Sequence, residues 1–229
     1  MRYTSLFFIL ILFSGCRPDT AIPIPGENDM SPVRYLALGD SYTIGESVPE
    51  TERWPVLLAK LLENEGLEVE VTVIARTGWT VDELWQGIQA REIAPPYDMV
   101  SLLIGVNDQY RGYEVREYRK QFIFLLNKAI EYAGGHPNRV IVLSIPDWGV
   151  TPFAAGRDRD QVAREIDEFN SVNRKESEKA GVHYLDITPL SRNASEHADL
   201  IASDGLHPSA KMYATWAEMV LPKALELLK

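Results

Sequence analysis

Short runs of apolar or alternating residues are interleaved with segments of helical periodicity from residue 33 to the end of the chain. Runs of this length that are rich in Val, Ile and Leu are typical of strands. Strands are predicted at residues 33–38, 68–74, 98–104, 139–144 and 182–186. Apolar residues spaced three and four apart predict helices that begin near residues 54, 81, 115, 162 and 212.

Strands that alternate with helices favour a parallel sheet with helices on both faces, joined by right-handed crossovers. The sequence shows no internal repeat and no second-domain boundary, so residues 33–229 are predicted to form one three-layer α/β/α domain. The alternating valines of residues 68–74 favour a strand at the edge of the sheet. In open sheets of this class, ligands bind at the carboxyl ends of the strands. Functional side chains are therefore expected where the predicted strands end.

Polar clusters follow three of the predicted strands, and a fourth cluster lies in the loop beyond the last strand. They are Gly39-Asp40-Ser41, Arg76–Trp79, Gly105–Asp108 and Asp204–His207. A serine hydroxyl becomes a good nucleophile when a neighbouring base takes its proton, and histidine titrates in the right range. A carboxylate can fix the tautomer of that histidine, while backbone N–H groups and an asparagine amide can bind a developing oxyanion. Together these parts predict acyl transfer.

The four clusters resemble, in order, the sequence blocks of the SGNH hydrolases, also called GDSL esterases or lipases. The resemblance implies that Ser41 is the nucleophile, His207 the base and Asp204 the partner of the histidine. It also implies an oxyanion hole made by Ser41, Gly78 and Asn107. The fold implied by the resemblance is the SGNH hydrolase fold, with a flavodoxin-like five-stranded sheet of order 2-1-3-4-5.

Two residues beside the expected nucleophile bear on this interpretation. Tyr42 stands where the name motif has leucine, a variation that leaves the chemistry untouched. Thr43 occupies the last position of G-x-S-x-G, so the nucleophile elbow of the α/β-hydrolases is absent. The segment Ser41-Tyr42-Thr43 also resembles the phosphate loop of flavodoxins, which makes a flavodoxin-like binding module the non-enzyme alternative. That alternative leaves Asp204 and His207 unexplained.

Three aromatic residues are candidates for the walls of a substrate pocket. Trp79 neighbours the expected oxyanion glycine, whereas Trp148 and Phe153 lie in a segment that either lines the pocket or packs over the end of the sheet. Because these walls are few and mixed with polar residues, we expect a compact site for acetyl or other short acyl esters, including acylated carbohydrates. Lysophospholipase-like, thioesterase and acyltransferase activities stay open on the same triad, since a fold alone does not fix the substrate.

Charge and cysteine content narrow the range of partners. The chain carries 23 basic and 33 acidic residues, a net charge of −10. Such an acidic surface repels phosphate backbones, so no nucleic-acid partner is expected. A single cysteine cannot form an internal disulfide, and with four histidines it makes a poor inventory of metal ligands. Neither a metal nor another cofactor is expected.

The first residues have the pattern of an export signal. Arg2 precedes the apolar run of residues 6–13, which is too short to span a membrane but matches the core of a secretory signal. The following Ser14-Gly15-Cys16 resembles the end of a bacterial lipoprotein signal. Residues 1–15 are therefore predicted to be a signal peptide, Cys16 to carry a lipid, and residues 16–32, with their four prolines, to form a tether. This predicts an exported protein of the cell envelope, at the outer membrane or the periplasmic face, that meets the membrane only through its anchor. The alternative is plain export with cleavage elsewhere.

Overall fold

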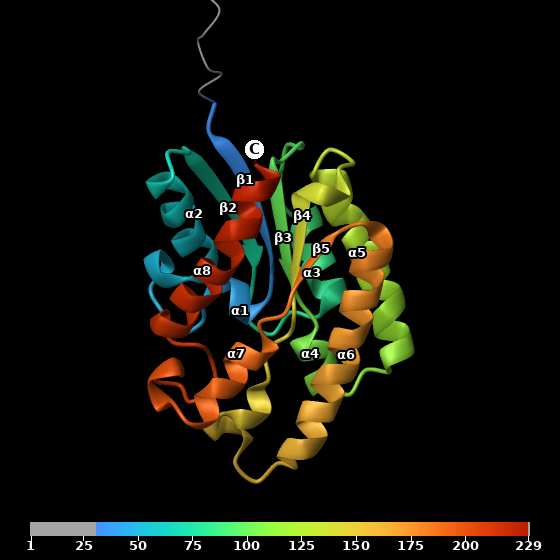
Figure 1. Ribbon diagram of the computed structural model, residues 1–229. Helices are drawn as coiled ribbons and strands as arrows, with labels where there is room; N and C mark the ends of the chain where they lie inside the picture. Colours follow the sequence, from blue (N-terminus) through green and yellow to red (C-terminus); the bar gives the residue numbers. More distant parts are fainter. Residues whose placement is uncertain (1–30, 229) are drawn as a thin grey trace, which may run out of the picture. The chain divides into compact units, whose positions relative to one another are not determined.

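Five strands form the central sheet of the computed structural model, which describes residues 31–228 (Figure 1). The strands are β1 (Val33–Gly39), β2 (Val69–Ala75), β3 (Met99–Leu103), β4 (Val140–Leu143) and β5 (His183–Leu185). They lie in the order β2-β1-β3-β4-β5, and every neighbouring pair is parallel. The predicted sheet order and each of the five predicted strands are confirmed.

Burial along the strands explains their sequence patterns. β3 and β4 are buried at every residue, which suits central strands covered by helices on both faces. In β2 the three valines are only half-buried and Glu70 is exposed, as expected for an edge strand. In the register of the sheet, Gly39 pairs with Ala75 on one side and with Leu103 on the other. The carboxyl ends of β1, β2 and β3 are therefore level, and the residues that follow them meet at one edge.

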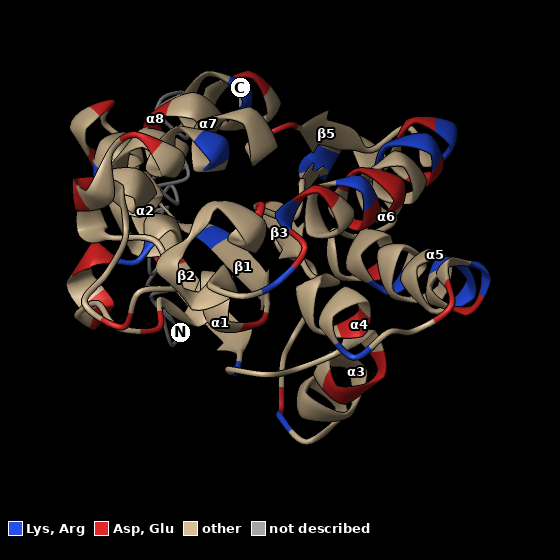
Figure 2. Cartoon of the chain, turned by 90° about the horizontal axis from the view of Figure 1, so that it is seen from below, with Lys and Arg blue, Asp and Glu red and all other residues tan. Residues whose placement is uncertain are grey.

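Helices cover both faces of the sheet (Figure 2). One layer contains α2 (Trp54–Asn64) and α8 (Ala210–Leu227), which pack against each other. The other contains α3 (Val81–Gln89), α5 (Val115–Tyr132) and α6 (Arg159–Ala180). These are the five helices predicted from periodicity. Each buries an apolar stripe, and complete burial of one large apolar side chain contributes about 1.5–3 kcal/mol.

Three short helices were not predicted, because four or five residues are too few to show a helical period. They are α1 (Ser41–Ile44), α4 (Val106–Tyr110) and α7 (Thr188–Arg192). α1 follows β1 and α4 follows β3 within two or three residues, so both begin at the carboxyl edge of the sheet. This edge, at the bottom of Figure 1, carries the candidate site.

The predicted signal peptide, Cys16 and the tether up to residue 30 lie outside the described residues. Within residues 31–228, no helix has the length and apolar character needed to span a membrane.

Candidate active site

The end of β1 sets the position of Ser41. Asp40 caps α1, and its Oδ1 accepts a hydrogen bond of 3.0 Å from the Tyr42 N–H. Glycine is required at position 39, because a Cβ there would lie 2.5 Å from the Leu103 carbonyl oxygen. The chain can therefore turn sharply after the strand, and Ser41 becomes the first residue of α1 at the sheet edge.

The turn after β2 presents Gly78 beside this serine. Gly78 has φ +86°, a conformation that glycine adopts readily and other residues rarely do. Its carbonyl oxygen accepts a 2.6 Å hydrogen bond from Nη2 of Arg111. Among residues 31–228, no intramolecular hydrogen bond uses the Gly78 N–H, so this donor is available to a substrate.

The turn after β3 presents Asn107. Gly105 has φ +123°, and a Cβ on it would lie 2.4 Å from the Tyr118 hydroxyl, so glycine is required there too. Asn107 follows in the first turn of α4, and its Nδ2 donates to the Trp79 carbonyl at 2.9 Å. This bond orients the Asn107 amide and leaves its second N–H available as a donor.

The loop between β5 and α8 holds the histidine and its carboxylate together. His207 Nδ1 and Asp204 Oδ2 are 2.6 Å apart. The other oxygen, Asp204 Oδ1, accepts from the backbone N–H groups of Leu206 and His207 at 2.9 and 3.0 Å. A carboxylate only accepts hydrogen bonds, so the pair places the ring proton on Nδ1 and leaves Nε2 as an acceptor. The Tyr42 ring packs against the histidine ring in a T-shaped arrangement, with ring centroids 5.7 Å apart.

Burial opposes ionisation of Asp204, but the hydrogen bonds from His207, Ser47 and the two backbone N–H groups outweigh it and hold the pKa of Asp204 below its ordinary value. This carboxylate is therefore charged throughout the neutral range, as a partner for a protonated imidazole must be.

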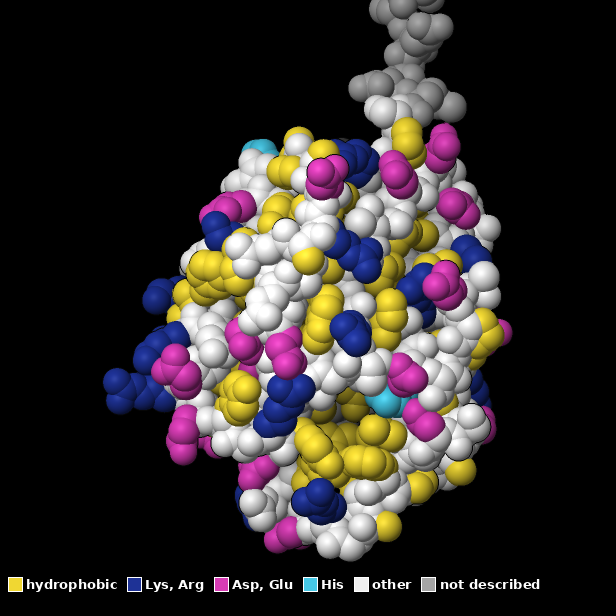
Figure 3. Space-filling view, turned by 180° about the vertical axis from the view of Figure 1, so that it is seen from behind, with side chains coloured by type: hydrophobic (Ala, Val, Ile, Leu, Met, Phe, Trp, Pro, Cys, Tyr) yellow, Lys and Arg dark blue, Asp and Glu magenta, His cyan; other side chains and the backbone are white. Residues whose placement is uncertain are grey.

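One cavity of about 160 Å³ brings the predicted site residues together. Ser41, Gly78, Asn107 and His207 all line it. Figure 3 shows a hollow lined by hydrophobic side chains, with a histidine and acidic side chains beside it. No hydrogen bond joins Ser41 to His207 in the described part of the chain, a common situation in enzymes without bound substrate.

Three aromatic side chains form one wall of this cavity. The ring centroids of Tyr110, Trp148 and Phe153 lie 5.4 to 6.1 Å from one another. Two of these rings, Tyr110 and Phe153, are about half exposed. The segment after β4 thus lines the pocket through Trp148 and Phe153, which was one of the two interpretations of the sequence.

Trp79 lies elsewhere and does not line the cavity, contrary to the sequence interpretation. Its indole packs against Gly87 of α3, where a Cβ would lie only 2.0 Å from the ring. Its backbone carbonyl still serves the site, because it holds the Asn107 amide. Proximity to Gly78 in sequence did not predict the direction of the side chain.

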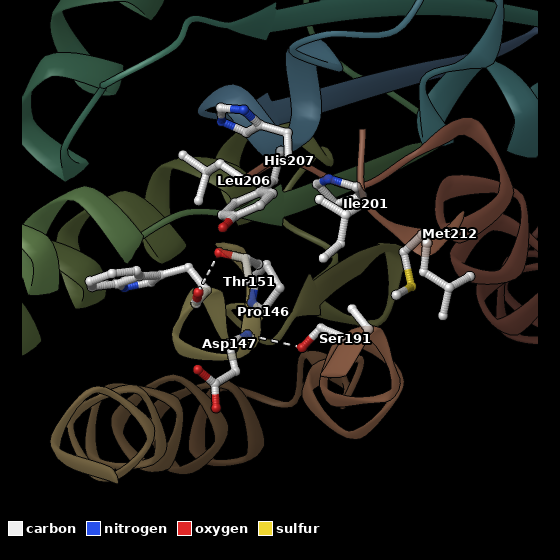
Figure 4. A pocket seen from close by; sticks show the side chains of 13 residues that line it. Pro146, Asp147, Thr151, Ser191, Ile201, Leu206, His207 and Met212 are labelled. Carbon is white, nitrogen blue, oxygen red and sulfur yellow. Dashed lines mark hydrogen bonds between the residues drawn. The ribbon is translucent and has the colours of Figure 1, made fainter. Parts of the chain in front are cut away.

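A second, much smaller cavity of about 20 Å³ lies beyond His207 (Figure 4). It shares Tyr42, Trp148, Leu206 and His207 with the larger cavity. Its volume suffices for about one water molecule. The wall around it is fixed by local hydrogen bonds, including one of 2.9 Å from the Asp147 N–H to the Ser191 hydroxyl. Next to His207, the larger cavity is therefore extended by space for only about one water molecule.

Two carboxyl groups, those of Asp40 and Asp108, are buried next to Ser41 and Asn107 in the chain. Burial raises the pKa of Asp40 to about 8 and that of Asp108 to about 7, although backbone hydrogen bonds oppose both shifts. Asp108 accepts from the Val81 N–H at 3.3 Å, which ties α4 to the start of α3. Both groups support the backbone of the site. Within residues 31–228, no group of three or more Cys, His, Asp or Glu residues could hold a metal ion.

Sequence reasoning did not identify several residues that complete the site. Arg111 holds the Gly78 carbonyl, Tyr110 extends the aromatic wall, and Ser47 contacts Asp204. Tyr110 ends α4 and Arg111 is its C-cap, three and four residues after Asn107, so a helix predicted there would have placed them near the cavity. No signal in the sequence connects Ser47 with a residue 157 positions away.

The five-stranded sheet of order β2-β1-β3-β4-β5 is the architecture of the SGNH class of ester hydrolases. The model of the GDSL-like lipase/acylhydrolase family matches residues 37–215, and the chain belongs to this family. It is therefore a carboxylic ester hydrolase of the GDSL type, as the sequence predicted.

Known relatives agree with this assignment. The chain is 25% identical over 193 residues to an acetylxylan esterase of Geobacillus stearothermophilus, a match that covers 77% of this chain and 86% of that enzyme. The fold is similar to that of the acetylxylan esterase Axe2 from the same organism, with a TM-score of 0.66, 22% identity, and coverage of 84% of this chain and 94% of the other. It is also similar to a lipase/acylhydrolase from Enterococcus faecalis, with a TM-score of 0.67, 20% identity, and coverage of 86% and 97%.

Proposed function

We propose that the protein removes a short acyl group, above all acetyl, from an ester by a Ser-His-Asp mechanism. One observation carries this proposal: Ser41, His207, Gly78 and Asn107 line a single cavity at the carboxyl edge of the sheet. A nucleophile, a base and two oxyanion donors around one space are the minimum set for acyl transfer.

The reaction follows from the roles that each group can fill. Nε2 of His207 takes the proton of the Ser41 hydroxyl while Oγ attacks the acyl carbonyl carbon. The developing oxyanion accepts hydrogen bonds from the Gly78 N–H, the Ser41 N–H and the free Asn107 N–H. The imidazolium, stabilised by Asp204, then protonates the departing alcohol. Water then attacks the acyl-enzyme while the same histidine takes its proton. The bond between Ser41 Oγ and the acyl carbon breaks, the imidazolium returns the proton to Oγ, and the acid is released.

The size of the cavity favours a short acyl group. At about 160 Å³ it is smaller than pockets that enclose drug-sized ligands, which measure roughly 300–1,000 Å³. The neighbouring cavity beyond His207 adds space for about one water molecule. An acetyl group needs little room, and the half-exposed rings of Tyr110 and Phe153 offer apolar faces to the alcohol part of the ester. The acetylxylan esterase relative supports an acylated carbohydrate as that alcohol part.

A chain-length series tests this proposal. We expect kcat/KM for p-nitrophenyl esters to be greatest at about two to four carbons and to fall for longer chains, because the cavity is small. Acetylated xylo-oligosaccharides should also be deacetylated. A maximum at ten or more carbons would contradict the proposal and indicate a lysophospholipase-like enzyme.

Export and lipid attachment through Cys16 stay predictions that rest on residues 1–32 of the sequence. Incorporation of a labelled fatty acid by the full-length chain, and its loss in Cys16→Ala, would test them.

A further inference from the structure

The loop that follows α1 contacts three segments of the candidate site: Ser41, the turn that contains Gly78, and the loop that contains His207. It begins on the nucleophile itself, because the Gly45 and Glu46 N–H groups both donate to the Ser41 carbonyl at 3.1 Å. The carboxylate of Glu46 accepts a hydrogen bond from the hydroxyl of Thr77, the residue before Gly78. The next residue, Ser47, reaches the loop of the histidine.

Ser47 contacts Asp204 at the oxygen that matters for catalysis. The Ser47 hydroxyl donates to Asp204 Oδ2 at 2.7 Å, and the same oxygen lies 2.6 Å from His207 Nδ1. The other hydrogen bonds to Asp204 come from Leu206 and His207 in its own turn. Among residues 31–228, Ser47 thus provides the one hydrogen bond that links this carboxylate to another segment of the chain.

The backbone of Ser47 is in an unfavourable conformation. Its φ is +67°, and it is the only residue other than glycine with a positive φ in the described part of the chain. Glycine adopts this conformation without steric cost, whereas a side chain is strained there. The loop therefore keeps a side chain where the backbone alone would favour glycine, and that side chain makes the contact with Asp204.

Asp204 needs such support because of where it lies. Its side chain is 31% exposed, in a loop between β5 and α8 that no strand of the sheet fixes in place. A carboxylate with free rotation toward solvent would share its hydrogen bonds with water and hold the imidazole in several orientations. Hydrogen bonds from His207, Ser47 and the backbone also lower the pKa of Asp204 against the effect of burial, in agreement with a firmly held anion.

We infer that Ser47 is a positioning residue: its hydroxyl holds Asp204 Oδ2 against His207 Nδ1 and couples this pair to the loop of the nucleophile. The inference rests on the proposed roles of Ser41, His207 and Asp204. Ser47 acts through Asp204, while the larger cavity is lined by other residues. Its loss should therefore change the rate of the chemical steps and leave ester binding nearly unchanged.

Two substitutions separate the hydroxyl from the backbone strain. Ser47→Gly removes both, whereas Ser47→Ala removes the hydroxyl and keeps the strain. We expect kcat for p-nitrophenyl acetate to fall about tenfold in both variants, with KM changed by less than about twofold, since a hydrogen bond to a charged group is lost in each. The melting temperature should be equal to or higher than that of the wild type in Ser47→Gly and lower in Ser47→Ala. A lower rate in a protein that is not less stable would not be expected from general damage.

Ser47→Thr completes the test because it restores the hydroxyl on a β-branched residue that is strained at this φ. It should melt at a lower temperature than Ser47→Gly but have a higher kcat. Ser195→Ala is the matched control, since the Ser195 hydroxyl is exposed and donates to the Arg192 carbonyl away from Asp204.

The outcomes distinguish this inference from the proposed function. Wild-type kcat in both Ser47→Gly and Ser47→Ala, together with an inactive Ser41→Ala protein, would overturn the role of Ser47 alone. A kcat that follows melting temperature across the three variants would overturn it as well, by indicating a purely structural role. Full activity in Ser41→Ala would instead overturn the proposed function, and the role of Ser47 with it.

Discussion

The two halves of the candidate site are positioned in different ways. Ser41, Gly78 and Asn107 each lie within four residues of the end of a strand, and the three strands concerned are neighbours in the sheet. Asp204 and His207 lie about twenty residues beyond β5, in a segment of short helices and turns. The register of the sheet places the first half, whereas local hydrogen bonds must place the second.

The loop that contains Asp204 and His207 is held together by contacts between its own two ends. An isolated bridge pairs Ile201 with Pro208, and the Ala202 N–H donates to the His207 carbonyl at 2.7 Å. These contacts fix the loop internally but do not join it to the nucleophile. Contacts from other segments, such as the Ser47 hydroxyl and the Tyr42 ring, supply that connection. The acid–base half therefore depends on side chains that the sheet does not dictate.

The largest expected effect tests whether the two halves work as one unit. Ser41→Ala and His207→Ala should each lower kcat by at least about 10³-fold, and the double variant should be hardly worse, because either loss removes the same activated nucleophile. Steady-state kinetics on p-nitrophenyl acetate measures this. His136→Ala is the control for the histidine, since His136 is exposed and lies between α5 and β4, away from the cavity. Losses that multiply in the double variant would show that the two halves act independently.

A smaller effect isolates the half that the sheet positions. Asn107→Ala should lower kcat about 10²–10³-fold with little change in KM, because an oxyanion donor acts mainly in the transition state. Asn127→Ala, an exposed position on α5, serves as the control. If KM rose while kcat held, Asn107 would be a binding residue for the ester rather than an oxyanion donor.

The same difference explains what could be predicted from the sequence. The strands and the clusters Gly39-Asp40-Ser41 and Gly105–Asp108 were predictable, because hydrophobic period and short turns are local properties. The order of the strands is not a local property, and it was predicted only through the resemblance to the SGNH hydrolases. The partnership of Asp204 with His207 was also visible, since Asp204 lies only three positions before His207. The contact of Ser47 with Asp204 and the direction of the Trp79 ring were not, because both depend on how distant segments pack.

The last prediction concerns stability and the buried carboxyl beside Ser41. Burial raises the pKa of Asp40 to about 8, and its Oδ2 has no hydrogen-bond partner within the described residues. In the unfolded chain an aspartate has a pKa near 3.9, so between about pH 4 and pH 8 the folded protein binds more protons than the unfolded one. The free energy of unfolding should therefore fall as pH rises through this window, and Asp108, with a pKa raised to about 7, adds to the same trend.

Asp40→Asn tests this dependence without removing the cap of α1, because asparagine is also a good N-cap and its Oδ1 can accept from the Tyr42 N–H. Between pH 5 and pH 8.5 the wild type should lose about 3–4 kcal/mol more unfolding free energy than the variant, measured by urea denaturation at each pH. Asp160→Asn, an exposed position on α6, should leave the wild-type slope unchanged. Parallel curves for the wild type and Asp40→Asn would contradict the raised pKa. A flatter curve for Asp40→Asn would show that the fold opposes the charge of a carboxyl in the half that the sheet positions. In the other half, hydrogen bonds stabilise the charge of Asp204.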